Sequence, residues 1–143
     1  MTIPTVLLPV FVQVFLTFFL LVWMARARIA ALQGGQARIP DVALRQQAWP
    51  ERATVVGNAF HNQLELPVLF YVLVALALHT RKVDLLFVAM SWAFVASRLA
   101  HAYVFVTTNR VPLRFRAFAV GALILLVMWI VFALRILFTG VAI

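Results

Sequence analysis

Long apolar segments separated by short polar stretches dominate this chain of 143 residues. Residues 1–25 and 117–134 carry no Asp, Glu, Lys or Arg, and each is about as long as the roughly 20 helical residues that cross a hydrocarbon core. Two further segments qualify when a few internal polar residues are accepted. Helices are expected rather than barrel strands, because the segments are long and lack a period of two. The pattern predicts one all-α integral membrane domain over residues 1–143, a four-transmembrane-helix bundle with helices at about 3–30, 51–79, 85–107 and 113–138.

Glycine and proline mark the connections between these helices. A polar loop over about 31–50 contains Gly34, Gly35, Pro40 and Pro50. The turn at 80–84 is short, so the second and third helices should be antiparallel neighbours. Inside the second helix, Pro67 removes one backbone hydrogen bond and frees a carbonyl, which predicts a kink just beyond a group of polar residues.

Composition supports a membrane setting, since 66% of residues are hydrophobic and only 11% are charged. The net charge of +8 is not read as nucleic-acid binding, because the basic residues lie mainly at the ends of the apolar segments. Contact with the lipid bilayer and its anionic headgroups is the simpler account. The chain has no cysteine, so thiolate metal ligation is excluded and any thiol chemistry has to come from a ligand.

The distribution of Lys and Arg predicts the orientation. More of them fall on the side of the loop at 31–50, which the positive-inside rule places in the cytoplasm, with both termini on the other side. That side receives Arg26, Arg28, Arg38, Arg45, Arg52, Arg110, Arg114 and Arg116, whereas the other receives Arg81, Lys82 and Arg135.

A stripe of polar residues interrupts the second apolar segment. Asn58, His61, Asn62 and Glu65 stand at positions 0, 3, 4 and 7 of a helical repeat, so in an α-helix they share one face. By the helical rise they lie roughly 8–20 Å inside the cytoplasmic start of their helix. An intramembrane carboxylate requires either a partner or a function.

The third helix brings polar groups to a similar depth. Arg98 and His101 lie roughly 9–14 Å inside its cytoplasmic end. We therefore expect Glu65 and Arg98 to form an ion pair, which would relieve the cost of a lone charge in lipid, roughly 2.5–3.5 kcal/mol on insertion scales. Such a pair alone would be structural.

Arginines at the helix ends add to this polar level. Arg26 or Arg28 from the first helix, and Arg110 and Arg114 from the fourth, would converge with His61, Asn62 and His101. Guanidinium groups and an amide suit an anionic ligand, and the N-terminal end of the fourth helix adds its positive dipole. The alternative is that these arginines only obey the positive-inside rule.

Three blocks of this sequence carry a family resemblance. They are Asn58-Ala-Phe-His-Asn62-Gln-Leu-Glu65 followed by a proline, Arg98-Leu-Ala-His101, and Arg110-Val-Pro-Leu-Arg114. In this order they resemble the MAPEG family, membrane-associated proteins in eicosanoid and glutathione metabolism, and specifically a bacterial-type member. The resemblance covers nearly the whole chain.

The resemblance implies a homotrimer in a bacterial inner membrane, with glutathione bound as co-substrate between subunits near the cytoplasmic side. It implies that Asn62, Glu65, His101 and Arg26 or Arg28 bind glutathione. Arg114 would be the catalytic residue, stabilising the thiolate for glutathione transferase or peroxidase chemistry on lipophilic electrophiles or hydroperoxides. The chemistry is consistent, because a nearby guanidinium favours the charged form of a thiol.

The chain also departs from the family pattern. Asn58 stands where the family usually has arginine, His61 where it has another basic residue, and Phe105, Phe115 and Phe118 where glutathione-using members often have tyrosine or serine. These departures leave a second interpretation open. In it the protein is a non-catalytic membrane scaffold, or an accessory subunit of a larger membrane complex, that keeps the fold without glutathione chemistry.

Overall fold

The computed structural model describes residues 2–43 and 48–138. Over these ranges it contains helices and no strand, and four helical stretches are long and apolar enough to cross a membrane. They are α1 (Ile3–Gln33), the second stretch Glu51–His79, α5 (Leu85–Val106) and α6 (Val111–Phe138). The predicted all-α, four-helix class is therefore confirmed.

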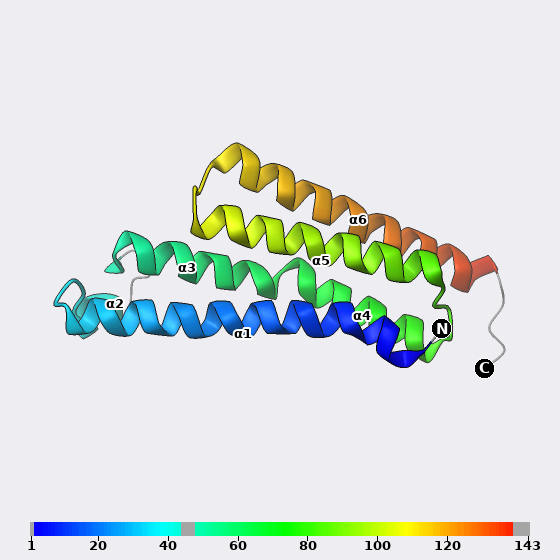
Figure 1. The fold of residues 1–143 in the computed structure, drawn as a ribbon, viewed down its shortest axis with the longest axis horizontal. Helices are drawn as coiled ribbons and strands as arrows, with labels where there is room; N and C mark the ends of the chain where they lie inside the picture. Colours follow the sequence, from blue (N-terminus) through cyan, green and yellow to red (C-terminus); the bar gives the residue numbers. More distant parts are fainter. Residues whose placement is uncertain (1, 44–47, 139–143) are drawn as a thin grey trace.

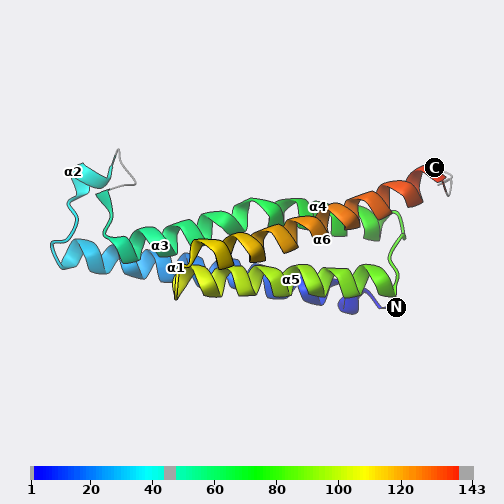
Figure 2. The ribbon, with the colours of Figure 1, turned by 90° about the horizontal axis from the view of Figure 1, so that it is seen from above.

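The four stretches lie side by side along one long axis (Figures 1 and 2). The segment α3 (Glu51–His61) packs against α1 and α5, whereas α6 packs along α5 and meets α4 (Leu66–His79). The N-terminal half of α6 is thus held mainly by α5. This arrangement leaves α3 and the start of α6 facing each other without close packing, and the candidate site lies there.

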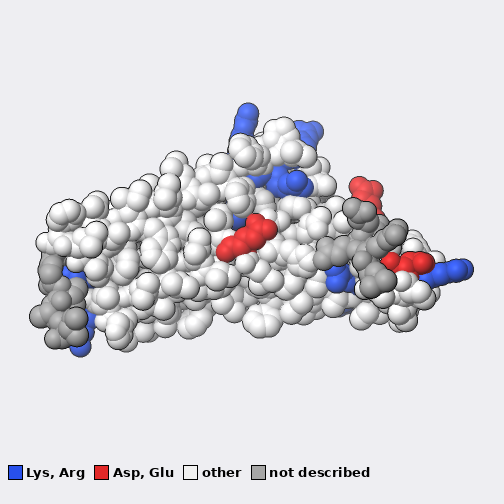
Figure 3. All heavy atoms as spheres, turned by 180° about the vertical axis from the view of Figure 1, so that it is seen from behind, with Lys and Arg blue, Asp and Glu red and all other residues white. Residues whose placement is uncertain are grey.

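Two buried clusters form the core. The larger joins α1, α4, α5 and α6 around Phe70, Phe94 and Met128, and the smaller joins α1, α3 and α5 around Leu20 and Phe105. Many large apolar side chains remain exposed on the outer faces, as expected for surfaces in contact with lipid. On the face in Figure 3 most of the surface is uncharged, basic atoms lie at both ends and also along the upper edge over the middle, and an acidic patch lies close below that middle group.

The second membrane stretch is broken rather than kinked at Pro67. After α3 the chain makes one 3-10 turn, η2 (Asn62–Leu64), and Glu65 then leaves helical geometry with φ −99° and ψ −104°. Pro67 lies in the first turn of the new helix α4, where its missing N–H costs nothing. The break therefore falls within the polar stripe, at Glu65, instead of beyond it as predicted.

A buried amide pair lies beside this break. Gln13 of α1 is 0% exposed, and its Nε2 donates to Oε1 of Gln63, which is 1% exposed, at 2.8 Å. The Gln63 Nε2 in turn donates to the carbonyl of Ala59 at 3.1 Å. The pair fastens η2 to α1 through a region where backbone and side-chain polar groups have no water to bond.

The loops contain two features that the sequence did not predict. A short helix, α2 (Ile39–Val42), forms inside the loop predicted at 31–50, whereas Arg45 lies outside the described residues. At the opposite end, Asp84 accepts from the N–H of Phe87 at 2.8 Å as the N-cap of α5 and pairs with Arg135 of α6 at 2.5 Å. The hydrogen bond from Arg135 holds the pKa of Asp84 below its ordinary value.

Candidate functional site

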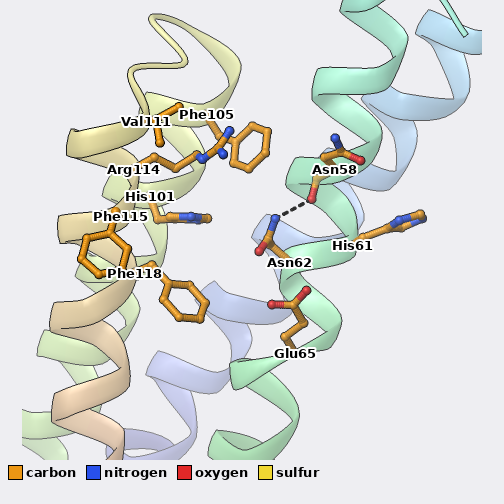
Figure 4. Close-up of a pocket in the computed structure, with 10 residues that line it drawn as sticks. All are labelled: Asn58, His61, Asn62, Glu65, His101, Phe105, Val111, Arg114, Phe115 and Phe118. Atoms are coloured by element: carbon orange, nitrogen blue, oxygen red, sulfur yellow. Dashed lines mark hydrogen bonds between the residues drawn. The ribbon is translucent and has the colours of Figure 1, made fainter. Parts of the chain in front are cut away.

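A cavity of about 480 Å³ opens between α3 and the paired α5 and α6. Its size falls within the range of roughly 300–1,000 Å³ that small-molecule sites occupy. Figure 4 shows its wall of polar groups on one side and a mixed aromatic and basic wall on the other. The lining residues are Asn58, His61, Asn62, Glu65, His101, Phe105, Val111, Arg114, Phe115 and Phe118.

The polar stripe supplies the first wall. Asn62 Nδ2 donates to the carbonyl of Asn58 at 2.8 Å, which ties the amide side chain to its own helix (Figure 4). Because the helix breaks at Glu65, that carboxylate projects toward α5 and α6 instead of continuing along α3. His61 lines the cavity, but its ring points to the side away from His101 and Arg114.

Arg114 supplies the positive charge of the opposite wall. Its Nη1 donates to Oδ1 of Asn109 at 2.7 Å, and its guanidinium carbon lies 4.2 Å from the ring centroid of Phe105. The side chain is half-buried, in the first turn of α6, where the helix dipole adds positive potential. Arg114 is the one Lys or Arg among the residues that line the cavity.

His101 lies deeper on the same wall. It is 3% exposed, and its ring centroid is 5.7 Å from that of Phe105 and 5.9 Å from that of Phe118. Its buried Nδ1 has no hydrogen-bond partner in the described part of the chain. A buried polar atom without a partner at the edge of a cavity is a position for a ligand or water to fill.

The predicted ion pair between Glu65 and Arg98 is wrong. No contact within 4.0 Å joins them, and the ion pair seen among the described residues is the one between Arg135 and Asp84. Arg98 is instead 0% exposed and turned toward α6, where Nη2 donates to the carbonyl of Ala117 at 3.4 Å. Its guanidinium carbon lies 5.2 Å from the ring centroid of Phe118. Glu65 is exposed at the helix break, and its carboxylate attracts the Arg98 guanidinium from a distance without forming an ion pair.

Three predicted arginines do not line the cavity. Arg26 and Arg110 are exposed, and Arg28 turns toward α3, with its guanidinium carbon 5.0 Å from the ring of Trp49 and beside Gly57. The structure thus places His61, Asn62, Glu65, His101 and Arg114 along one cavity of a single chain and leaves Arg26, Arg28 and Arg110 outside it.

Sequence reasoning assigned no role at this site to Asn109, and it treated Phe105 and Phe118 only as departures from the family. Asn109 lies in the turn between α5 and α6, with a positive φ of 46°. An asparagine in a predicted turn, five residues before a helix-start arginine, is the signal that marks it. No signal in the sequence identifies the phenylalanine rings as packing partners of a cation.

The site combines one cation, one carboxylate and several amide and imidazole groups. It suits a small zwitterionic or anionic ligand, because a guanidinium binds an anion and a carboxylate binds an ammonium. No group of three or more His, Cys, Asp or Glu residues that could hold a metal ion occurs in the described ranges.

Comparison with known proteins matches residues 6–134 to the MAPEG family. No curated protein and no solved structure matched the chain. The family match spans nearly the whole chain, including most of each of the four membrane helices and every residue that lines the cavity. The chain is therefore a member of the MAPEG family.

Proposed function

We propose that this protein binds glutathione in the cavity and activates its thiol as a glutathione transferase or peroxidase. The observation that carries the proposal is the position of Arg114, the cation of a cavity that also contains a carboxylate and an unpartnered buried imidazole nitrogen. Members of this family commonly use glutathione, which supports the choice of ligand.

Glutathione carries an ammonium group, two carboxylates and a thiol, and the lining offers a polar partner for each kind of group. Glu65 is the acidic residue of the lining and receives the ammonium. Asn62 and His101 offer hydrogen bonds to the peptide and carboxylate oxygens. Arg114 faces the thiol and lowers its pKa by favouring the charged form.

The reaction then follows from the thiolate. The thiol gives its proton to water, and the sulfur attacks an electrophilic carbon. The C–S bond forms as the bond to the leaving group breaks, and that group departs with the bonding electrons. With a hydroperoxide, the sulfur attacks the terminal oxygen, and the O–O bond breaks to give an alkoxide, which takes a proton. The sulfenic acid formed reacts with a second glutathione to give a disulfide and water. A lipophilic substrate reaches the sulfur from the bilayer.

Turnover of an aryl halide with glutathione tests this function. Replacing Arg114 with Gln should lower kcat/KM roughly tenfold or more, because one unit of thiol pKa changes the thiolate fraction about tenfold near neutral pH. Arg116 provides a matched control, since it lies two residues away, is exposed and does not line the cavity. Equal activity of Arg114→Gln and Arg116→Gln would reject the role of Arg114.

A non-catalytic scaffold is the second candidate, and the phenylalanines of the lining favour it. Phe105, Phe115 and Phe118 give that wall an apolar surface with no hydroxyl donors. In this candidate the polar stripe serves helix packing or a larger membrane complex. A wild-type protein that turns over neither electrophiles nor hydroperoxides would favour the scaffold.

We further propose that the chain works as a homotrimer. The cavity has exposed lining residues, among them Asn58, Val111 and Phe115, and the outer helix faces expose many large apolar side chains that a second copy would cover. The mass of the protein in detergent, with bound detergent subtracted, measures this state. A stable monomer would contradict it.

A further inference from the structure

The turn between α5 and α6 has an unusual backbone at Asn109. The residue has φ 46°, in the left-handed region that asparagine tolerates better than most side chains. Its N–H donates to the carbonyl of Val104 at 2.8 Å, which closes the end of α5. This conformation directs the amide side chain across the first turn of α6, toward Arg114.

Asn109 and Phe105 hold the Arg114 guanidinium from two sides. The amide oxygen accepts from Nη1 at 2.7 Å, whereas the aromatic ring stacks on the guanidinium at 4.2 Å. The hydrogen bond acts within the guanidinium plane and the ring acts on its face, so together they restrict translation and tilt. The neighbouring Arg110 and Arg116 are exposed and make no such pair of contacts with the residues that the structure describes.

The partner of Arg114 is neutral, which matters for the charge of the cavity. An amide oxygen orients a guanidinium without compensating its charge, whereas a carboxylate at the same place would form an ion pair with it. No carboxylate of a described residue lies within 4.0 Å of Arg114. The full positive charge therefore remains available to a ligand.

We propose that Asn109 is a positioning residue that aims the Arg114 guanidinium into the cavity and so sets how strongly the site favours a bound thiolate. The proposal rests on the proposed function, because it concerns the thiol of bound glutathione. Asn109 belongs neither to the polar stripe nor to α6, so the turn between α5 and α6 would itself influence the reaction by holding Arg114.

Two substitutions separate positioning from charge. Asn109→Gly keeps the left-handed backbone but removes the oxygen, so Arg114 loses one of its two restraints. Asn109→Asp keeps the shape and the acceptor but adds a charge that compensates Arg114. Thr107→Ala is the matched control, because it removes a polar side chain of the same turn that bonds only the carbonyl of Tyr103.

The experiment is a pH titration of bound glutathione, with the thiolate followed by its ultraviolet absorbance in detergent-solubilised protein, together with kcat and KM for an aryl halide. Asn109→Gly should raise the thiol pKa by roughly 0.5–1 unit, because a less restrained Arg114 attracts the thiolate more weakly. Asn109→Asp should raise it by more, because the added carboxylate compensates the charge of Arg114. For Asn109→Gly, kcat should fall roughly threefold to tenfold near neutral pH, because the thiolate fraction falls by that factor, with KM for glutathione within about twofold. Thr107→Ala should titrate like the wild type.

The outcomes are distinguishable. A wild type that forms a thiolate, with both Asn109 variants titrating like it, would overturn the positioning role alone. Asn109→Asp lowering the thiol pKa would also overturn it, because a negative charge that compensates Arg114 should raise that pKa. A wild type with no bound thiolate at any pH would overturn the proposed function and this inference with it. If Asn109→Gly does not fold, the isosteric Asn109→Asp still decides.

Discussion

Arg98 and Arg114 carry the same guanidinium group into different surroundings. Arg98 is 0% exposed, and its Nε and Nη1 have no hydrogen-bond partner among the described residues. Arg114 is half-buried, has the neutral Asn109 as partner and lines the cavity. Arg114 is therefore the guanidinium that a ligand in the cavity can contact, whereas Arg98 packs between α5 and α6.

Close packing around Arg98 depends on Gly121. A Cβ at position 121 would lie 2.5 Å from Ser97 Oγ and 3.2 Å from Arg98 Nε. We expect Gly121→Ala to lower the free energy of unfolding by about 1–3 kcal/mol, as overpacking does. The double variant Ser97→Ala, Gly121→Ala should recover part of this loss, because the nearest atom is removed. Thermal unfolding in detergent measures the stability of both variants. If Gly121→Ala were as stable as the wild type, the close approach of residue 121 to Ser97 would be contradicted.

Among the helices, the second membrane stretch shows which features local sequence patterns predict and which they do not. Spacing predicted that Asn58, His61, Asn62 and Glu65 share one helix face, and all four line the cavity although the helix breaks among them. Treating Pro67 as an interior proline misplaced the distortion, because a proline in the first turn of a new helix needs no kink. The break is fastened by an amide 50 residues away in sequence, and local patterns do not reveal such a partner.

The buried amide pair gives a test of that fastening. Gln13→Leu leaves the oxygen of Gln63 without its partner in the core, and we expect the free energy of unfolding to fall by about 1–3 kcal/mol. Replacing both Gln13 and Gln63 with Leu should restore most of it, because neither amide then remains unpaired. Gln36→Leu, at an exposed loop position, is the control for thermal unfolding in detergent. A double variant less stable than Gln13→Leu would contradict this account.

The contact between Asp84 and Arg135 predicts a pH dependence at the other end of the bundle. Because the pKa of Asp84 is lowered in the folded protein, its contribution is complete above about pH 4, the unfolded value, and is lost as the pH falls through the folded pKa. The Asp84 side chain is 45% exposed, so Asp84→Asn should cost only about 0.5 kcal/mol at neutral pH. Unfolding curves of the two proteins should converge on acidification; a widening difference would contradict the pairing.

At the scale of the whole molecule, the apolar segments predicted the four membrane helices because lipid leaves a long apolar chain few alternatives. Placing side chains across helices was less reliable. His101 and Arg114 line the same cavity as the polar stripe, as expected. Arg28 instead contacts Trp49, and Arg98 bonds the carbonyl of Ala117. The rotation of each helix about its axis depends on packing, and residue spacing alone does not fix it.

Orientation stays a prediction that the absence of cysteine makes easy to test. Single cysteines at Gln36 and His79, both exposed and at opposite ends, would be the only thiols in the chain. A membrane-impermeant maleimide should label Gln36→Cys from the cytoplasmic side only and His79→Cys from the other side only. The reverse pattern would contradict the positive-inside assignment.

Equilibrium dialysis of glutathione against the detergent-solubilised protein measures directly whether the cavity binds glutathione. We expect the wild type to retain glutathione with a Kd at or below about 1 mM, a free energy near −4.1 kcal/mol. Arg114→Gln should weaken binding at pH values where the thiolate forms, by roughly tenfold, and Arg116→Gln by less than about twofold. No retention by the wild type at millimolar glutathione, or equal losses in both variants, would contradict the claim that this cavity binds glutathione through Arg114.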